Sequence, residues 1–161
     1  RALNVIDVAA EAAGWNEPTP SGVARGMAYF ESYGSLCAQV VEVSLRNGKP
    51  SVRNVVCVLD CGSVVLPDAV KAQMEGCVIM GLSTALGEQV IIKDGGAANT
   101  NFNQYRVRRM AEAPTQIDTI IIESGEKIGG VGQTPVAPPA PALANAIFAL
   151  TGRPVRSLPL A

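Results

Sequence analysis

The chain has 161 residues, a length that suits one domain or two small ones that share an interface. Hydrophobic residues make up 48% of it and charged residues 17%, so it can bury a core and is not disordered. With 13 basic and 14 acidic residues, a formal net charge of -1 and no basic patch, the composition argues against nucleic acid and anionic membranes as partners.

The first element is a predicted helix. Apolar residues recur at helical spacing over residues 3–13, and Gly14 is a normal helix stop. The following WNEPTPSG is a linker, since Pro18 and Pro20 disfavour a helix. We therefore divide the chain into an N-terminal helix and linker, residues 1–20, and a main body, residues 21–161.

Three extended runs follow, GVARGMAYFESYG, LCAQVVEVSLRNG and SVRNVVCVLDCG. The pair Asn47-Gly48 lies between the last two and is a strong hairpin signal, so these runs predict antiparallel strands. Asp60 ends the third run, beside Cys61 and Gly62. There it is expected to cap a turn rather than act as a catalytic acid, because Asp bonds nearby backbone N–H groups.

A helix is predicted over residues 68–86, with Pro67 at its first position and Asp68 in its first turn. Its GCVIMGL segment is apolar on every side, which predicts burial by surrounding elements. Gly76 and Gly81 each cost about 1 kcal/mol relative to Ala in a helix interior. The simplest reason for such glycines is the close approach of a neighbour or a ligand.

The remaining elements complete an α+β pattern. QVIIKDGG predicts a strand and turn, residues 96–114 have no clean period, and QIDTIIIES predicts a strand. Pro139 to Leu150 predicts a helix that ends at Gly152, and PVRSLPL is a short terminal strand or an extended tail. We expect one mixed sheet with helices packed on it.

Residue types also limit the chemistry. Histidine is absent, which excludes Ser-His and Cys-His nucleophile systems and the most common zinc ligand. The four cysteines form no C-x-x-C pair, so we expect buried free thiols; these favour the cytoplasm but leave the periplasm open. No apolar run approaches the roughly 20 residues of a membrane span.

Polar candidates outside a motif have competing readings. Tyr105, Arg106, Arg108 and Arg109 suit either a phosphate or acidic partner or, more commonly, a solvated charged face. Glu123 and Glu126 flank a turn and are expected to be solvated. The stretch GGVGQTPVAPPAP, residues 129–141, places one glutamine between a flexible glycine loop and a rigid proline run, a pattern that points to a bound ligand.

Several of these motifs resemble one family in the same order. DCGSVVLPDAVKAQMEGCVIMGLSTAL and GGVGQTPVAPPAPALANAIFALTGRPVRSLPL are similar to the C-terminal part of the molybdenum hydroxylase large subunit, a family that includes xanthine dehydrogenase and aldehyde oxidase. Within it, the likeness is to isoquinoline 1-oxidoreductase beta subunits and related bacterial aldehyde dehydrogenases. ESYGSLCAQVVEVSL also fits, so the resemblance covers nearly the whole chain.

The resemblance implies a molybdopterin-binding module that hydroxylates aldehydes or N-heterocycles with oxygen from water. It implies the cytosine dinucleotide form of the cofactor and iron–sulfur clusters on a separate small subunit. The implied cofactor-binding residues are Gln73, Glu75, Gly76, Gly130, Val131 and Gly132, and Gln133 stands at the catalytic position. A Gln side chain, with a donor and an acceptor, suits a pterin edge. The partners implied are the remainder of the large subunit and the small subunit.

Two departures from the family affect its function. The family usually has a glutamate base where this chain has Gln133, and a carboxamide cannot accept a proton. The upstream glycine segments of the family are missing and the chain starts at Arg1, so we expect a piece of a longer protein that is inactive by itself. The alternative is an impaired or non-enzymatic scaffold module. A general nucleotide-binding domain ranks far below, because the chain lacks a P-loop and a strand followed by G-x-G-x-x-G.

Overall fold

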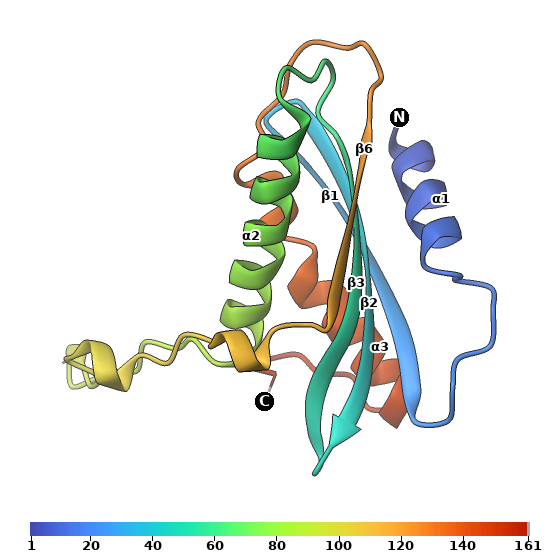
Figure 1. Cartoon of the computed structure of the whole chain (residues 1–161). Helices are drawn as coiled ribbons and strands as arrows, with labels where there is room; N and C mark the ends of the chain where they lie inside the picture. Colours follow the sequence, from blue (N-terminus) through green and yellow to red (C-terminus); the bar gives the residue numbers. More distant parts are fainter. Residues whose placement is uncertain (161) are drawn as a thin grey trace.

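The computed structural model describes residues 1–160, and a four-stranded mixed sheet forms its centre (Figure 1). The spatial order is β1-β2-β3-β6, with bounds β1 Val23–Ser32, β2 Ser35–Arg46, β3 Lys49–Asp60 and β6 Gln116–Ile122. The first three strands are antiparallel neighbours, and β6 pairs parallel with β3. The predicted α+β fold with one mixed sheet is therefore confirmed.

Two tight turns connect the antiparallel strands. Asn47 and Gly48 have φ values of 53° and 75°, and Tyr33 and Gly34 have 51° and 76°. Positive φ at both central residues is the type I′ geometry, whose twist matches that of the flanking strands. The Asn47-Gly48 hairpin is confirmed. The turn at Tyr33 and Gly34 was not predicted, because tyrosine seldom adopts positive φ.

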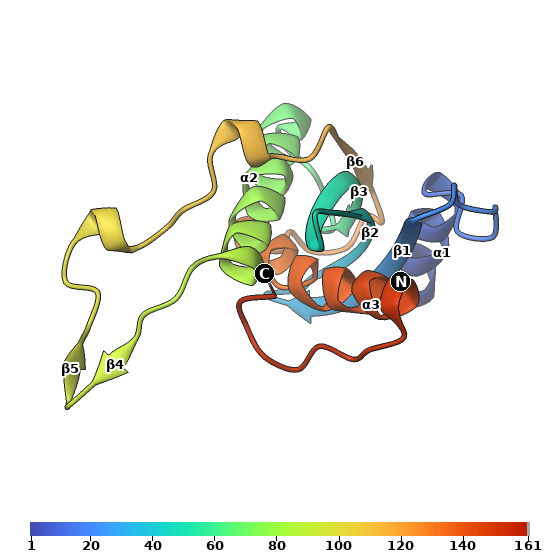
Figure 2. The same ribbon diagram turned by 90° about the horizontal axis from the view of Figure 1, so that it is seen from below.

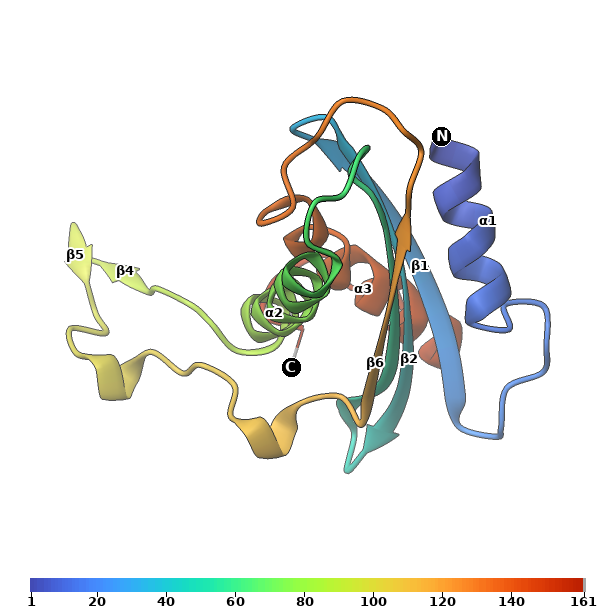
Figure 3. The same cartoon turned by 45° about the horizontal axis from the view of Figure 1, so that its top comes forward.

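Helices cover both faces of the sheet, as Figures 1 and 3 show. On one face, α1 (Ala2–Ala12) packs Val5 and Ala9 against Ala38 and Val40 of β2. On the other face lie α2 (Pro67–Leu86) and α3 (Pro139–Thr151), over a separate buried cluster that includes Val41 of β2. Because successive strand residues point to opposite faces, β2 is apolar on both sides and nearly continuous in hydrophobicity.

The helix α2 begins with Pro67 at its first turn and Asp68 behind it, as predicted. The expectation that GCVIMGL is buried on every side is wrong, since Met80 is 63% exposed whereas Cys77 and Leu82 are buried. The helix packs on one side against the sheet, α3 and the 3₁₀ helix η3 (Thr134–Val136). Its opposite side, which includes Gln73 and Met80, is exposed.

An extended arm, residues 88–112, leaves the body between α2 and β6 (Figure 2). The strand predicted at QVIIKDGG shrinks to β4 (Ile92–Lys93), which pairs with β5 (Gly96–Ala97) in a separate two-stranded ribbon outside the main sheet. The ribbon's residues are exposed, so no core holds a longer strand there. The predicted irregularity of the arm is confirmed, apart from the 3₁₀ helices η1 (Phe102–Gln104) and η2 (Met110–Glu112).

The C-terminal elements agree with the sequence. The helix α3 ends at Gly152, whose φ of 68° is the left-handed conformation that closes many helices. The following residues form an extended tail rather than a strand, and the Leu160 N–H donates to the Ala85 carbonyl at 2.7 Å. Within residues 1–160, no helix combines the length and the apolar character needed to span a membrane.

Candidate functional site

Two segments far apart in the sequence, the first half of α2 and the glycine loop of residues 129–133, lie side by side. The Cys77 thiol donates to the Gly132 carbonyl, with 3.3 Å from Sγ to O. A Cβ built on Gly132 would lie 3.6 Å from Oε1 of Gln73. The structure therefore brings together Gln73 and Gly132, which sequence reasoning placed in the same site.

The glycines of this region divide into two groups by their surroundings. A Cβ on Gly81 would lie 2.5 Å from the Val136 carbonyl oxygen, and one on Gly129 would lie 2.3 Å from Ser35 Oγ, so packing within the chain requires both glycines. Gly76 has nothing within 4 Å of its Cβ position, and Gly132 has only the ordinary contact with Gln73. Packing within residues 1–160 therefore does not explain the absence of a side chain at these two positions.

Backbone hydrogen bonds hold the start of the glycine loop against the sheet. The Gly129 N–H donates to the Cys61 carbonyl at 2.8 Å, and the Gly130 N–H donates to the Tyr33 carbonyl at 2.9 Å. The loop thus continues from the ends of β3 and of the β1–β2 hairpin. Val131 is half-buried and packs against the core cluster beneath α2 and α3.

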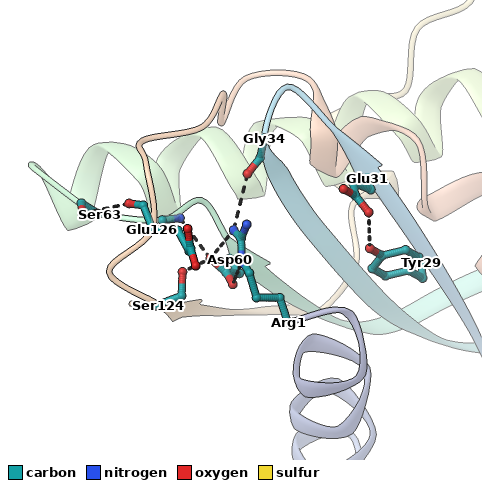
Figure 4. Close-up of polar contacts among 9 residues, drawn as sticks. Arg1, Tyr29, Glu31, Gly34, Asp60, Ser63, Ser124 and Glu126 are labelled. Atoms are coloured by element: carbon teal, nitrogen blue, oxygen red, sulfur yellow. Dashed lines mark hydrogen bonds and ion pairs between the residues drawn. The ribbon is translucent and has the colours of Figure 1, made fainter.

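A polar cluster around Asp60 anchors the chain just before the loop (Figure 4). The Asp60 side chain is 1% exposed and accepts hydrogen bonds from Arg1, from the Ser124 hydroxyl at 2.7 Å and from the Gly62 N–H at 3.0 Å. The Arg1 guanidinium, followed by the Ser124 and Gly62 donors, lowers the pKa of Asp60 to about 2 against the opposing effect of burial. The expected capping role of Asp60 is confirmed by its bond with the Gly62 N–H. Asp60 also binds Arg1 and Ser124, which belong to two other segments of the chain.

Ser63, just after β3, also binds the segment that leads to the glycine loop. The Ser63 N–H and hydroxyl both donate to the Glu126 carbonyl, at 3.0 and 3.1 Å (Figure 4). The side chains of Glu123 and Glu126 are exposed, as expected. Residues 123–130 are consequently fixed at several points to the end of β3.

Gln133 immediately precedes η3 and has an exposed side chain. The residues after it are buried and held by polar contacts: the Thr134 hydroxyl donates to the Ser32 carbonyl at 3.0 Å, and the Gln39 amide donates to the Pro135 carbonyl at 2.7 Å. Gln133 therefore sits at the exposed end of a rigidly supported segment. Sequence reasoning missed Gln39 and Thr134, although Gln39 interrupts the apolar run of residues 36–41 in β2.

The predicted site residues do not all share one surface. Gln73 and Gly76 are three residues apart on α2 and lie on neighbouring positions of its exposed side. Glu75 is also exposed, but two residues along a helix correspond to a rotation of about 200°, so it faces a different direction from Gln73. The geometry groups Gln73, Gly76 and Gly132 and leaves Glu75 apart.

The chemistry available at this surface is hydrogen bonding. Burial raises the pKa of the Cys77 thiol, which keeps it protonated and able to donate to Gly132. No cluster of three His, Cys, Asp or Glu side chains suited to a metal ion occurs in residues 1–160.

The four cysteines are buried free thiols, as predicted. For Cys57, the hydrogen bond with Cys37 and then burial raise the thiol pKa well above its ordinary value.

Some side chains in the arginine-rich segment of the arm form ion pairs or hydrogen bonds with other residues of the arm. Arg106 forms an ion pair with Glu112, and the Tyr105 hydroxyl donates to Glu88 at 2.8 Å. Arg106 and Arg109 are exposed, in line with a solvated charged face, whereas Arg108 is half-buried. The segment lies at the opposite end of α2 from Gln73.

The sequence model of the molybdopterin cofactor-binding domain matches residues 4–114. The chain is 36% identical over 165 residues to the beta subunit of isoquinoline 1-oxidoreductase from Brevundimonas diminuta, covering 99% of this chain and 21% of that relative. It is 32% identical over 180 residues to a nicotinate dehydrogenase subunit from Pseudomonas putida, covering 99% of this chain and 15% of that relative. It thus spans about a fifth or less of their length.

Solved structures show the same fold. The aldehyde oxidoreductase from Desulfovibrio desulfuricans superposes with a TM-score of 0.68 at 27% identity, over 78% of this chain and 14% of that chain. Quinoline 2-oxidoreductase from Pseudomonas putida superposes with a TM-score of 0.67 at 22% identity, over 78% of this chain and 17% of that chain. The second likeness supports the fold alone.

Proposed function

Because the chain belongs to the molybdopterin cofactor-binding domain family, we propose that it serves as the C-terminal cofactor-binding part of a molybdenum hydroxylase large subunit. Its relatives include an isoquinoline 1-oxidoreductase, an aldehyde dehydrogenase and a nicotinate dehydrogenase, which favours aldehydes or N-heterocycles as the substrate class. In this role residues 1–20 are an N-terminal helix and linker and residues 21–161 are the main body.

The observation that carries the proposal is the pair of open glycines beside Gln73. Gly76 lies in a helix interior, where glycine costs about 1 kcal/mol relative to alanine, and no neighbour within residues 1–160 requires it. Gly132, on the adjacent loop, has only an ordinary contact with the Gln73 side chain at its Cβ position. A ligand that approaches the backbone closely accounts for both glycines, because any side chain there would occupy the ligand's place.

The residues on this surface fit a pterin. Gln73 offers an amide donor and a carbonyl acceptor from one exposed side chain, which suits the alternating polar edge of such a ring. The loop of Gly130, Val131 and Gly132 supplies backbone groups from a segment that the sheet holds in place. Glu75, which faces another direction, would contact a different part of the cofactor. When bound, the molybdenum cofactor supplies the oxidation of the substrate with oxygen taken from water.

Gln133 limits the proton-transfer chemistry of the proposed site. Its exposed carboxamide can donate and accept hydrogen bonds, but it cannot hold a proton taken from a reacting group. We therefore assign it the role of orienting the substrate or the cofactor through hydrogen bonds. Since Thr134 and Pro135 behind it are buried and hydrogen-bonded, its backbone position is well defined.

The second candidate function is a scaffold module that keeps the fold without catalysis. The same carboxamide at Gln133 favours it, since the resemblance implies a glutamate base at this position and a carboxamide cannot accept a proton. The two candidates differ in whether the large subunit carries molybdenum.

We further propose the cytosine dinucleotide form of the cofactor and a small iron–sulfur subunit as the electron acceptor. The support for a partner is that the curated relatives are themselves named as subunits of larger enzymes. Hydrolysis of the extracted cofactor tests the nucleotide: release of cytidine monophosphate is expected, and guanosine monophosphate would contradict the assignment.

The cofactor site is tested by filling the open glycines. The large subunit containing this chain is produced with its small subunit in a host that makes the cofactor, and molybdenum and pterin are measured. Gly76→Leu and Gly132→Val should lose most of both while the unfolding transition is retained. Ala12→Leu, at an exposed position of α1 on the opposite face of the sheet, is the matched control and should keep them.

Either of two results would contradict this assignment. Full molybdenum content in both site variants would show that the ligand does not occupy the space at Gly76 and Gly132. A large subunit that carries no molybdenum at all, although folded, would favour the scaffold function.

A further inference from the structure

A small apolar pocket lies at the base of the arm, nearer the C-terminal end of α2 than the proposed cofactor surface. Ile79 and Leu82 of α2 line one part of it, and Met110, Ala113 and Pro114 line another. Its volume is about 160 Å³, whereas sites for drug-sized ligands measure roughly 300–1,000 Å³. The pocket therefore suits a single side chain better than a free small molecule.

Two arginines, Arg108 and Arg109, also line this pocket. Arg108 donates to the Glu112 carbonyl at 2.7 Å, and no carboxylate within residues 1–160 forms an ion pair with it. The Glu112 carboxylate is instead engaged by Arg106 and by the Arg109 N–H. Burial lowers the pKa of Arg108, and the nearby Glu112 charge acts against this effect without forming an ion pair with Arg108.

Further positive charge borders the neighbouring surface. Arg46 and Lys49, at the β2–β3 hairpin, line an adjacent hollow together with Arg108. Glu112 is the one carboxylate among the residues that line the two hollows, and it is already paired. The charge of this region is therefore complementary to an acidic partner.

The arm beside the pocket exposes large apolar side chains. Ile92 is 69% exposed, Phe102 93% and Met110 90%, and Val90 and Ile91 are more than half exposed. The two-stranded ribbon of β4 and β5 packs against no core, and an isolated hairpin of this kind is marginally stable in water. An arm with these properties is typical of a segment that is covered in an assembly.

We propose that the pocket and the arm form a docking surface for a polypeptide segment that inserts an apolar side chain between Leu82 and Met110 and sets a carboxylate against Arg108. The segment lies outside residues 1–160. Relatives that contain this fold are about five times longer or more, so they have the polypeptide to supply it. The surface is separate from the cofactor role and requires no molybdenum.

The proposal is tested with the chain itself and a defined peptide. The probe is the blocked pentapeptide acetyl-Gly-Glu-Leu-Glu-Gly-amide, and the readout is the amide NMR shifts of Ile79, Leu82 and residues 108–114 in labelled protein. The peptides with Gln-Leu-Gln and Glu-Gly-Glu at the centre remove the carboxylates or the apolar side chain. We expect saturable shifts at these residues for the probe and at least roughly tenfold weaker binding for each altered peptide.

Protein variants separate the two halves of the surface. Arg108→Gln and Met110→Ser should each weaken the probe's binding by about tenfold or more, and Met110→Ser carries little folding risk because its side chain is 90% exposed. Arg153→Gln, an exposed change of equal charge after α3, is the control and should bind normally.

Three results would overturn the proposal. The first is the absence of shifts at the pocket residues, and the second is equal binding by the control and both pocket variants. The third is a dimer, seen by sedimentation at rising protein concentration, that Arg108→Gln dissociates, since a second copy of the chain would then be the occupant.

Discussion

The guanidinium of Arg1 donates two hydrogen bonds to the carboxylate of Asp60, with 2.8 Å from Nε to Oδ2 and 2.9 Å from Nη2 to Oδ1. This pair joins the start of α1 to the end of β3, and Asp60 also accepts from Ser124 on the way to the glycine loop. One buried carboxylate therefore links three chain segments that converge beside the proposed site.

The first prediction concerns acid stability. The folded pKa of Asp60 is about 2, below its ordinary value of 3.8, so its contribution is complete above about pH 4 and is lost as the pH falls toward 2. Allowing for the partly exposed Arg1, we expect it to be worth about 1–2 kcal/mol. Urea unfolding at pH 6, 4 and 2.5 measures it. Asp60→Asn should be less stable at pH 6 and should lack this component of the acid loss; parallel curves for the two proteins would refute the assignment.

The second prediction compares two glycines of the same helix. Gly81→Leu, and even Gly81→Ala, should destabilise the chain by roughly 1–3 kcal/mol or more, because the added Cβ would meet the Val136 carbonyl and Pro139. Gly76→Ala should stabilise it by up to about 1 kcal/mol, since its Cβ position is empty and alanine is the better helix former. Equal effects in chemical denaturation would mean that η3 does not pack on α2 as described.

The third prediction concerns Gln133. In the cofactor-loaded large subunit with its small subunit, Gln133→Glu should raise turnover of aldehydes or N-heterocycles, and a positioned base typically contributes about 10²–10⁴-fold. Because the side chain is exposed, the unfolding free energy should stay unchanged. Gln133→Ala is the companion variant. Ordinary turnover by the unaltered enzyme, kept in Gln133→Ala, would exclude any catalytic role for Gln133.

The fourth prediction is that residues 1–161 alone fold but retain no molybdenum. The proposed surface of Gln73, Gly76 and Gly132 is exposed on one side, so few contacts offset the cost of ordering and desolvating a bound cofactor. Elemental analysis of the purified chain, alongside its circular dichroism, is the measurement. Near-equimolar molybdenum in the folded chain would be inconsistent with this view.

The sequence predicted one hairpin of the main sheet and two helix ends because their signals were local. The Asn47-Gly48 turn, Pro67 at the start of α2 and Gly152 at the end of α3 each determine the backbone through their own φ preference. The exposed side of α2 could not be predicted in this way. Met80 continues an apolar run, and only the position of the helix on the sheet shows that this residue is left uncovered.

The candidate site could not be assembled from local patterns. The resemblance named Gln73 and Gly132 separately, and their proximity depends on the packing of η3 against α2, which no local pattern encodes. The supports at Gln39 and Thr134 depend on contacts across the fold, as does the link from Arg1 to Asp60. The length of the strand at QVII was overestimated. These residues have the composition of a strand, but they do not pair with the main sheet.

The arm leaves and re-enters the body within the connection between the parallel strands β3 and β6, and the turn between β4 and β5, at Asp94 and Gly95, lies at its far end (Figure 2). Chain length can therefore change at that tip without altering the register of any strand in the main sheet. A fluorescent reporter or an affinity tag inserted between Asp94 and Gly95 should leave the folded body intact.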